Sequence, residues 1–251
     1  MPLIVRDEGA YIVVITIDNQ AKRNAMSRAD LGQLADLWDK LDASPCRAIV
    51  ITGAGDKGFC AGADIGGDLT AAEETAAVVN RALLKTKAFS KPIIAAVNGD
   101  CAGGGVELLL STDIRIAAPH ARFGLPEVKW SIYPFGGATV KLVNQIGYVH
   151  AMDLLLTGRL IDAATAARLG LINEVAAAGT ALDAAVTKAR VIAENSPSAV
   201  QAVKFQVSQT IAEHTQSREA LEQQLGDRVR AGPHFAEGVA AFKEKRKPRY
   251  E

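Results

Sequence analysis

The 251-residue sequence is poor in the residues that mark several large protein classes. It has three cysteines, Cys46, Cys60 and Cys101, with no short metal-ligand spacing and an odd number for disulfides, so we expect small buried thiols in a reducing compartment. Lys plus Arg equal Asp plus Glu at 28 each, so no net charge favours nucleic acid or an anionic membrane as partner. The first residues contain no apolar run long enough for a signal peptide or a membrane span. We therefore expect a cytoplasmic protein.

The remaining composition is typical of a compact folded chain. Hydrophobic residues make up 49% of the sequence and charged residues 22%, which argues against disorder. Short β-branched runs alternate with helical stretches in the first half, a pattern that predicts an α/β core. The strands are expected at 11–17, 48–52, 92–97 and 113–118, and the helices between them at 27–43, with Ser27 as N-cap, and at 71–90.

The second half of the chain is predicted to be mostly helical. No linker, repeat or charge block divides it from the first half, so we treat residues 1–190 as a core and residues 191–251 as a helical extension. Such an extension packs either on its own core or on a neighbouring subunit, and the sequence leaves both open. The expected elements are a helical stretch at 138–170, the brief segment 171–175, and helices at roughly 180–194, 197–212, 216–231 and 233–246.

The first candidate functional segment is the glycine-rich sequence ITGAGDKGFCAGADIGGD at residues 51–68. Glycine lets backbone amides point into a cavity and approach a ligand closely, which predicts a site of backbone donors. An irregular surface loop is the alternative. Because the segment has neither the Lys-Ser/Thr pair of a P-loop nor the spacing of a dinucleotide fingerprint, we do not expect a nucleotide-hydrolysing loop.

Two glutamates follow this segment. Glu107 lies in the apolar run VELLL directly after three glycines, where a buried carboxylate is costly unless it is hydrogen-bonded, paired or functional. A place in the first helical turn suits its negative charge, although its carboxylate could equally lie in solvent. Glu127 follows Pro126 in a loop-like stretch and would, alone, be an ordinary surface acid. Two carboxylates in different environments can divide the roles of general acid and general base.

Several motifs occur in a fixed order over nearly the whole chain. They are AKRNAMS at 21–27, AGADI at 61–65, NGDCAGGGVEL at 98–108, FGLPEV at 123–128, YPFGGATVKL at 133–142, LLLTGRLIDAATAARLGLINEV at 154–175 and AFKEKRKPRY at 241–250. Together they resemble the crotonase superfamily, typified by enoyl-CoA hydratase. The resemblance implies an α/β fold, a crotonase-like spiral of ββα repeats, with C-terminal helices that assemble homotrimers, often paired into hexamers as dimers of trimers.

The resemblance also implies an active site. The backbone amides of Ala63 and Gly104 would form an oxyanion hole for the thioester carbonyl oxygen, whose negative charge grows as an enolate forms. Glu107 would activate the water that attacks the β-carbon of a 2-enoyl-CoA, and Glu127 would supply the proton at the α-carbon. The reverse reaction is dehydration. No metal or redox cofactor is expected.

Coenzyme A enters this scheme as part of the substrate. It would lie across the loop that contains Ala61, Asp64 and Ile65. Its adenine would lie near AKRNAMS, where Lys22 and Arg23 meet phosphates. This segment lacks the proline that often precedes the family motif.

Three further residues belong to the expected substrate site. Lys245 matches a family lysine that reaches the nucleotide, from the same or a neighbouring subunit, and a solvated basic tail is the alternative. Trp130 and Phe135 are candidates for the acyl pocket, with core packing as the alternative. Phe135 also replaces the first glycine of the Pro-Gly-Ala-Gly-Gly sequence common in hydratases, where the backbone amide helps to hold the catalytic water. A bulky side chain there would narrow or re-aim the pocket.

Other functions remain open on the same motifs. An enoyl-CoA isomerase would use Glu127 alone and leave Glu107 a bystander. Thioester hydrolysis or decarboxylation would use the same oxyanion hole, because it stabilises any of these charge shifts. A catalytically silent member would bind acyl-CoA or RNA, but the neutral charge and the lack of a long basic stripe argue against RNA.

Overall fold

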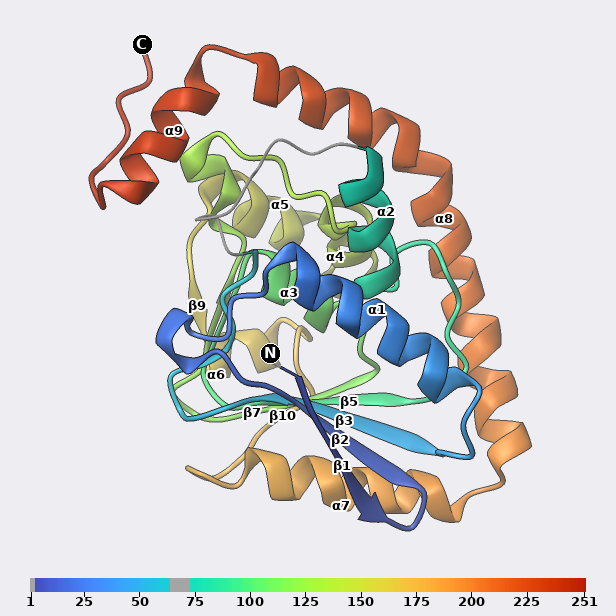
Figure 1. Ribbon diagram of the computed structural model, residues 1–251. Helices are drawn as coiled ribbons and strands as arrows, with labels where there is room; N and C mark the ends of the chain where they lie inside the picture. Colours follow the sequence, from blue (N-terminus) through green and yellow to red (C-terminus); the bar gives the residue numbers. More distant parts are fainter. Residues whose placement is uncertain (1–2, 64–72) are drawn as a thin grey trace.

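The computed structural model describes residues 3–63 and 73–251, which form two sheets enclosed by helices (Figure 1). The strands are β1 Leu3–Gly9, β2 Ile12–Ile17, β3 Ala48–Gly53, β4 Gly58–Cys60, β5 Ile93–Val97, β6 Asp100–Ala102, β7 Ile114–Ala117, β8 Arg122–Gly124, β9 Ile161–Asp162 and β10 Glu174–Val175. The helices are α1 Arg28–Asp42, α2 Glu73–Ala82, α3 Gly104–Leu109, α4 Ala138–Ile146, α5 Tyr148–Thr157, α6 Ala163–Arg168, α7 Ala181–Glu194, α8 Pro197–Ala231 and α9 His234–Lys243. Two 3₁₀ helices, η1 Gln20–Lys22 and η2 Pro126–Trp130, complete the described elements.

The chain alternates between the two sheets. The larger sheet has the order β1-β2-β3-β5-β7-β10 and the smaller one β4-β6-β8-β9. The pairs at the centre of both sheets are parallel, whereas β1 with β2 and β8 with β9 are antiparallel. Each of β3, β5 and β7 in the larger sheet is followed directly by a strand of the smaller sheet and then by a helix, α2, α3 or η2. These repeated ββα units are the predicted crotonase-like α/β spiral.

Two hydrophobic layers cover opposite faces of the larger sheet, because successive side chains of a strand point in opposite directions. Ile15, Ile49 and Ile51 face the layer that contains α1 and α3. Val14 and Val50 face α7, which runs along the other face in Figure 1. The α7 residues in this contact are mostly alanines four positions apart, so the helix lies close to the strands. They are Ala181, Ala185, Ala189 and Ala193.

The strongest local predictions are confirmed. The four expected strands correspond to β2, β3, β5 and β7. Ser27 caps α1 as predicted, and its hydroxyl accepts a hydrogen bond from the Asp30 amide while Asp30 accepts from the Ser27 amide. Cys46, Cys60 and Cys101 are buried free thiols.

The predicted helix ends were less accurate. The stretch 138–170 is divided at Gly147 and Gly158, which have φ values of 80° and 58° and end helices there. The predicted break between 212 and 216 was wrong, because α8 continues unbroken and the Thr215 hydroxyl donates to the Ile211 carbonyl inside the helix. The helix expected at 71–90 ends at Ala82, since the chain turns at Leu84, where φ is 44°.

The long helix α8 lies on one side of the molecule. It runs from beside α7 to α9 at the opposite end (Figure 1). Its buried residues, Ala212, Thr215, Glu222 and Gly226, all lie from the middle of the helix onward. Among the described helices, none combines the length and the apolar composition needed to cross a membrane.

The close packing of α7 on the sheet predicts how the protein responds to a larger side chain. Ala189 is fully buried against the strands, so Ala189→Leu should lower the free energy of unfolding by about 1–3 kcal/mol through overpacking. Thr187 is exposed on the same helix, and Thr187→Leu should change it by less than about 0.5 kcal/mol. Urea unfolding followed by tryptophan fluorescence measures both. Equal effects of the two substitutions would contradict the assigned packing.

Candidate active site

Two glycine-containing segments lie side by side where β4 and β6 end. Cys60 and Cys101 are partners in the parallel pairing, so the chains leave the sheet together. A Cβ at Gly62 would lie only 2.8 Å from the Gly104 nitrogen, and Gly62 has a φ of 92°. Both facts require glycine at this position. The Met26 amide donates to the Gly62 carbonyl at 2.9 Å, which fixes the first segment from the other side.

This approach brings together the two amides expected to form the oxyanion hole. A Cβ on Gly104 would lie 3.5 Å from the Ala63 nitrogen, so the two residues are direct neighbours. Gly104 is the first residue of α3, and its amide therefore has no carbonyl partner within the helix. Two neighbouring backbone donors at a helix start suit an oxygen atom that gains negative charge. Asp64 and Ile65, also expected in this loop, lie outside the described residues.

Glu107 projects from α3 into a buried environment, and only 5% of the residue is exposed. Its Oε1 atom accepts hydrogen bonds from the amides of Gly136, at 2.6 Å, and Ala138, at 3.3 Å. Burial, and next the negative charge of Glu222, raise the pKa of Glu107 to about 7, against the opposite effect of the two amides and of Lys85. The two amides therefore hold the carboxylate in place, and the carboxylate titrates near neutral pH.

Glu127 lies in η2, beside Gly103, the N-cap residue of α3. A Cβ at Gly103 would lie 3.1 Å from its Oε1 atom. Its Oε2 atom is buried and has no hydrogen-bond partner within residues 3–63 and 73–251. Burial, and next the negative charge of Glu107, raise the pKa of Glu127 to about 8. A buried carboxylate oxygen without a partner is costly, which indicates an atom that serves a ligand.

The turn that contains Glu127 is held by the C-terminal part of the chain. The ring of Trp130 packs edge-on against Phe242 of α9, with centroids 5.2 Å apart. A Cβ at Gly238 would lie 2.0 Å from the Trp130 carbonyl oxygen, so α9 touches η2 directly. The Tyr250 hydroxyl donates to the Lys129 carbonyl at 2.8 Å. Packing thus accounts for the position of Trp130, and its role in an acyl pocket stays a prediction.

Phe135 packs against α8. A Cβ at Gly226 would lie 2.1 Å from its ring, and the ring also meets Tyr133 edge-on at 5.6 Å between centroids. The Arg230 guanidinium lies 5.2 Å from the ring centroid. The bulky side chain that replaces the usual glycine is therefore accommodated by a glycine on a helix about ninety residues further on. The sequence shows both residues but not that they meet.

The residues expected to bind coenzyme A are only partly brought together. Ala61 and Arg23 are adjacent, because the Ala61 amide donates to the Arg23 carbonyl at 3.1 Å. Lys22 ends η1 beside them and is exposed. The Arg23 guanidinium lies 3.4 Å from a carboxylate oxygen of Asp100. Lys245 is exposed after α9, in the tail whose Tyr250 hydroxyl donates to the Lys129 carbonyl of η2.

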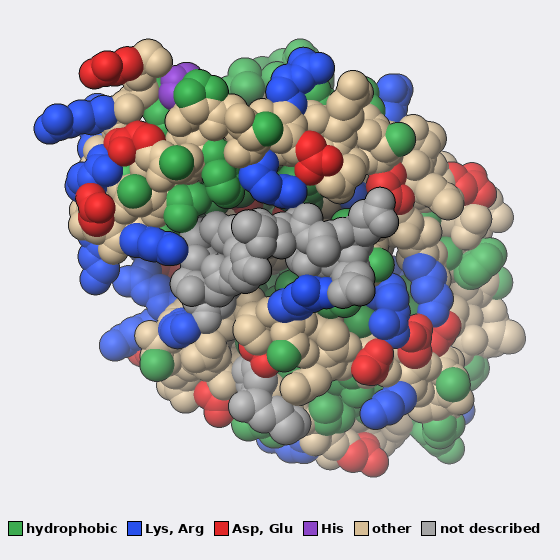
Figure 2. Space-filling view, turned by 45° about the horizontal axis from the view of Figure 1, so that its top comes forward, with side chains coloured by type: hydrophobic (Ala, Val, Ile, Leu, Met, Phe, Trp, Pro, Cys, Tyr) green, Lys and Arg blue, Asp and Glu red, His purple; other side chains and the backbone are tan. Residues whose placement is uncertain are grey.

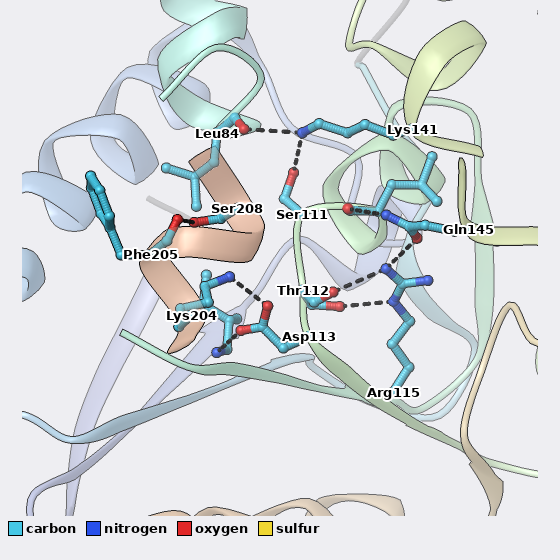
Figure 3. Close-up of polar contacts among 12 residues, drawn as sticks. Leu84, Ser111, Thr112, Asp113, Arg115, Lys141, Gln145, Lys204, Phe205 and Ser208 are labelled. Carbon is cyan, nitrogen blue, oxygen red and sulfur yellow. Dashed lines mark hydrogen bonds and ion pairs between the residues drawn. The ribbon is translucent and has the colours of Figure 1, made fainter. Parts of the chain in front are cut away.

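A cavity of about 760 Å³ lies between the first half of α8 and the ends of α3 and α4. Figure 3 shows its polar wall, where Lys141 donates to the Leu84 carbonyl at 3.0 Å and to the Ser111 hydroxyl at 3.0 Å. Lys141 is buried, and desolvation lowers its pKa to about 7. Lys204 pairs with Asp113 on the same wall. Neither Glu107 nor Glu127 lines this cavity, which therefore differs from the candidate active site.

Sequence reasoning missed three charged residues behind the site. Lys141 lies within the motif at 133–142, but a lysine in an amphipathic helix is usually a surface residue. Lys85 and Glu222 lie outside every motif and form a buried ion pair at 2.6 Å. No local signal distinguishes them from exposed charges.

Comparisons with known proteins agree with this geometry. The sequence pattern of the enoyl-CoA hydratase/isomerase family matches residues 7–251. The chain belongs to the enoyl-CoA hydratase/isomerase family, within the crotonase superfamily. It is 40% identical over 249 residues to the enoyl-CoA hydratase EchA19 of Mycobacterium tuberculosis, covering 96% of this chain and 93% of that protein. These matches support a hydratase-like enzymatic function.

Two further relatives extend the comparison. The mevalonyl-coenzyme A hydratase sidH of Aspergillus fumigatus is 37% identical over 247 residues, covering 96% of this chain and 91% of that protein. The crystal structure of a carnitinyl-CoA hydratase from Mycobacterium avium superimposes with a TM-score of 0.89 at 36% identity, covering 100% of this chain and 98% of that one. The fold and the family of this enzyme are thus established together.

The contact between the 135–138 loop and Glu107 predicts a sensitive position. A Cβ at Gly136 would lie 2.6 Å from both Cδ and Oε2 of Glu107, so Gly136→Ala should displace the carboxylate and lower kcat by roughly 100-fold. Gly32 is the control, because a Cβ there meets nothing within 4 Å and α1 should only be strengthened. Turnover of a 2-enoyl-CoA, followed by absorbance, measures both variants. Full activity in Gly136→Ala would contradict this role of the loop.

Proposed function

We propose that this hydratase-like enzyme adds water reversibly to a 2-enoyl-CoA thioester. The amides of Ala63 and Gly104 hold the thioester oxygen as the enolate forms, and Glu107 and Glu127 move the protons. The observation that supports this most directly is that Glu107 lies in the first turn of α3 and Glu127 lies beside Gly103, next to that pair of amides. Every catalytic group in the proposal belongs to the protein, so it calls for no metal or redox cofactor.

The raised pKa values of both glutamates suit proton transfer near neutral pH, because burial favours the neutral form of each carboxyl group. Glu107, whose Oε1 atom accepts two backbone hydrogen bonds, acts as the general base that activates water. Glu127 supplies the proton at the α-carbon. The orphaned Oε2 atom of Glu127 gains its partner when substrate is bound.

For coenzyme A, the proposal places the nucleotide near Lys22 and Arg23. Arg23 lines a small cavity of about 500 Å³ in which basic side chains outnumber acidic ones, a composition that suits phosphate groups. The tail after α9 adds Lys245 as a further exposed cation, from the same or a neighbouring subunit. The other residues of the cavity are Asp56, Lys57, Asp100, His120 and Arg122.

The alternative of nucleic-acid binding receives little support. Figure 2 shows Lys and Arg side chains interspersed with acidic ones over the displayed face, instead of a continuous basic stripe. Isomerisation by Glu127 alone is the stronger alternative, because Phe135 replaces a glycine that hydratases use to hold water. The two mechanisms differ in whether Glu107 is needed.

The test compares Glu107→Gln and Glu127→Gln with wild type in the hydration of short and medium 2-enoyl-CoA substrates. Each substitution keeps the size of the side chain but removes proton transfer, so kcat should fall about 100-fold to 10,000-fold. Glu194→Gln, exposed at the end of α7, is the matched control and should retain full activity. Because the base must be ionised and the acid protonated, kcat/KM of wild type should rise as pH passes about 7 and fall above about 8. Hydration retained in Glu107→Gln would exclude the two-glutamate mechanism. A wild-type protein that does not hydrate the substrate but isomerises it, with isomerisation lost in Glu127→Gln and kept in Glu107→Gln, would favour the isomerase.

The enzyme is further proposed to form homotrimers. The first half of α8 exposes Val203, Phe205 and Val207, with exposed fractions of 68%, 51% and 59% in the single chain. Val203 and Val207 lie one turn apart on one side of the helix, and Phe205 lies on another side. Exposed apolar side chains of this kind are typical of a helix that another subunit covers.

Light scattering on the purified protein tests this assembly. A mass three or six times that of one chain is expected, and Phe205→Glu should lower it, whereas the exposed Glu213→Gln on the same helix should leave it unchanged. A monomeric wild-type protein would rule out the trimer.

A further inference from the structure

Lys85 and Glu222 form an ion pair in the interior, with Nζ and Oε2 2.6 Å apart and side chains only 4% and 3% exposed. The two residues come from distant parts of the chain, the turn after α2 and the second half of α8. A buried ion pair contributes little net stability, since removing two charges from water offsets their attraction. Its presence therefore calls for a reason other than stability.

The ion pair lies directly behind the 135–138 loop. The Thr139 hydroxyl, next to this loop, donates to Oε1 of Glu222 at 3.0 Å. A Cβ at Gly137 would lie 3.2 Å from Cγ of Lys85, so the lysine stem packs on the loop backbone. Four residues after Glu222, Gly226 receives the ring of Phe135. Both ends of the loop are thus held by α8, and this is the loop whose two amides bind the Glu107 carboxylate.

The turn that contains Lys85 is itself fixed. Lys141 donates to the carbonyls of Leu83 and Leu84 and to the hydroxyl of Ser111, and Figure 3 shows the last two contacts. Ser111 follows α3 closely, so these bonds tie the turn after α2 to the helix of Glu107. Lys85 therefore enters the ion pair from a rigid backbone.

We propose that the Lys85–Glu222 ion pair is a positioning element for Glu107. It clamps the loop that holds the Glu107 carboxylate, and its two charges act on that carboxylate in opposite senses. This positioning role rests on the proposed function of Glu107 as general base.

The charges around Glu107 determine what the pair should do. Glu222 of α8 raises the pKa of Glu107, and Lys85 lowers it. Three other ionisable groups face Glu107, and the variants described below leave all three unchanged. They are Glu127 in η2, Tyr133 before the loop and Lys141 in α4. Neutralising one member of the ion pair should thus move the titration of Glu107 in one direction, and neutralising the other should move it the opposite way.

The experiment uses the variants Glu222→Gln, Lys85→Met and the double variant in the otherwise complete enzyme. Glu222→Gln should shift the acid limb of the kcat/KM profile to lower pH by roughly one unit, and Lys85→Met should shift it upward by a similar amount. The double variant should return close to the wild-type profile. Glu219→Gln, three residues earlier on α8 and bonded to Asn80 instead, is the matched control and should leave the profile unchanged.

A second readout does not depend on activity. The carboxyl band of Glu107 in infrared difference spectra, assigned by subtracting spectra of Glu107→Gln, reports its titration in the resting enzyme. Failure of the proposed catalytic role would therefore leave this test of the ion pair intact.

The outcomes are distinct. Opposite shifts of the acid limb of the kcat/KM profile in the two single variants, with recovery of the wild-type profile in the double variant, support the positioning role. A purely structural role would lower activity at every pH and leave the acid limb in place. Shifts in the same direction, or no shift in Glu222→Gln relative to Glu219→Gln, would overturn it. If Lys85→Met does not fold, that comparison of the two glutamine variants decides the question alone.

Discussion

The candidate active site depends on the close approach of two backbone segments where β4 and β6 leave the smaller sheet. A Cβ at Gly105 would lie 2.1 Å from the Cys60 carbonyl oxygen, and one at Gly62 would lie 2.8 Å from the Gly104 nitrogen. Only glycine allows this distance. The same contact places the Ala63 and Gly104 amides together and orients α3, from which Glu107 projects. The rest of the site is built around this one approach.

Two buried carboxylates next to these amides are unfavourable for stability, and the C-terminal helices compensate by holding them in place. The 135–138 loop donates two hydrogen bonds to Glu107 and is clamped by α8. The turn of Glu127 is covered by α9 and the tail. The C-terminal helices, which the family resemblance assigned to subunit assembly, thus also support both candidate catalytic glutamates. Preorganised groups of this kind need little rearrangement when the reaction proceeds.

The smaller sheet shows why part of the fold escaped prediction. Its strands are only two or three residues long, as in β6, Asp100–Ala102, which is too short for an alternating pattern to be recognised. The four inner strands of the larger sheet were predictable because they are mostly buried and rich in β-branched residues, whereas the exposed edge strands β1 and β10 were not predicted. The break expected between residues 212 and 216 was wrong, because no glycine or proline interrupts α8 there.

The sequence by itself determined the central strands, the capped helix α1, the family, and the glycine segments and glutamates of the candidate site. Each of these features can be recognised from residues that are close together in the sequence, as a periodic pattern, a helix cap or a motif. Only the tertiary structure decided that Lys85 meets Glu222, that Phe135 rests on Gly226, and that the Oε2 atom of Glu127 is buried. These contacts join segments far apart in the chain, and their burial follows from packing. A local sequence pattern does not specify which distant residue a side chain will contact.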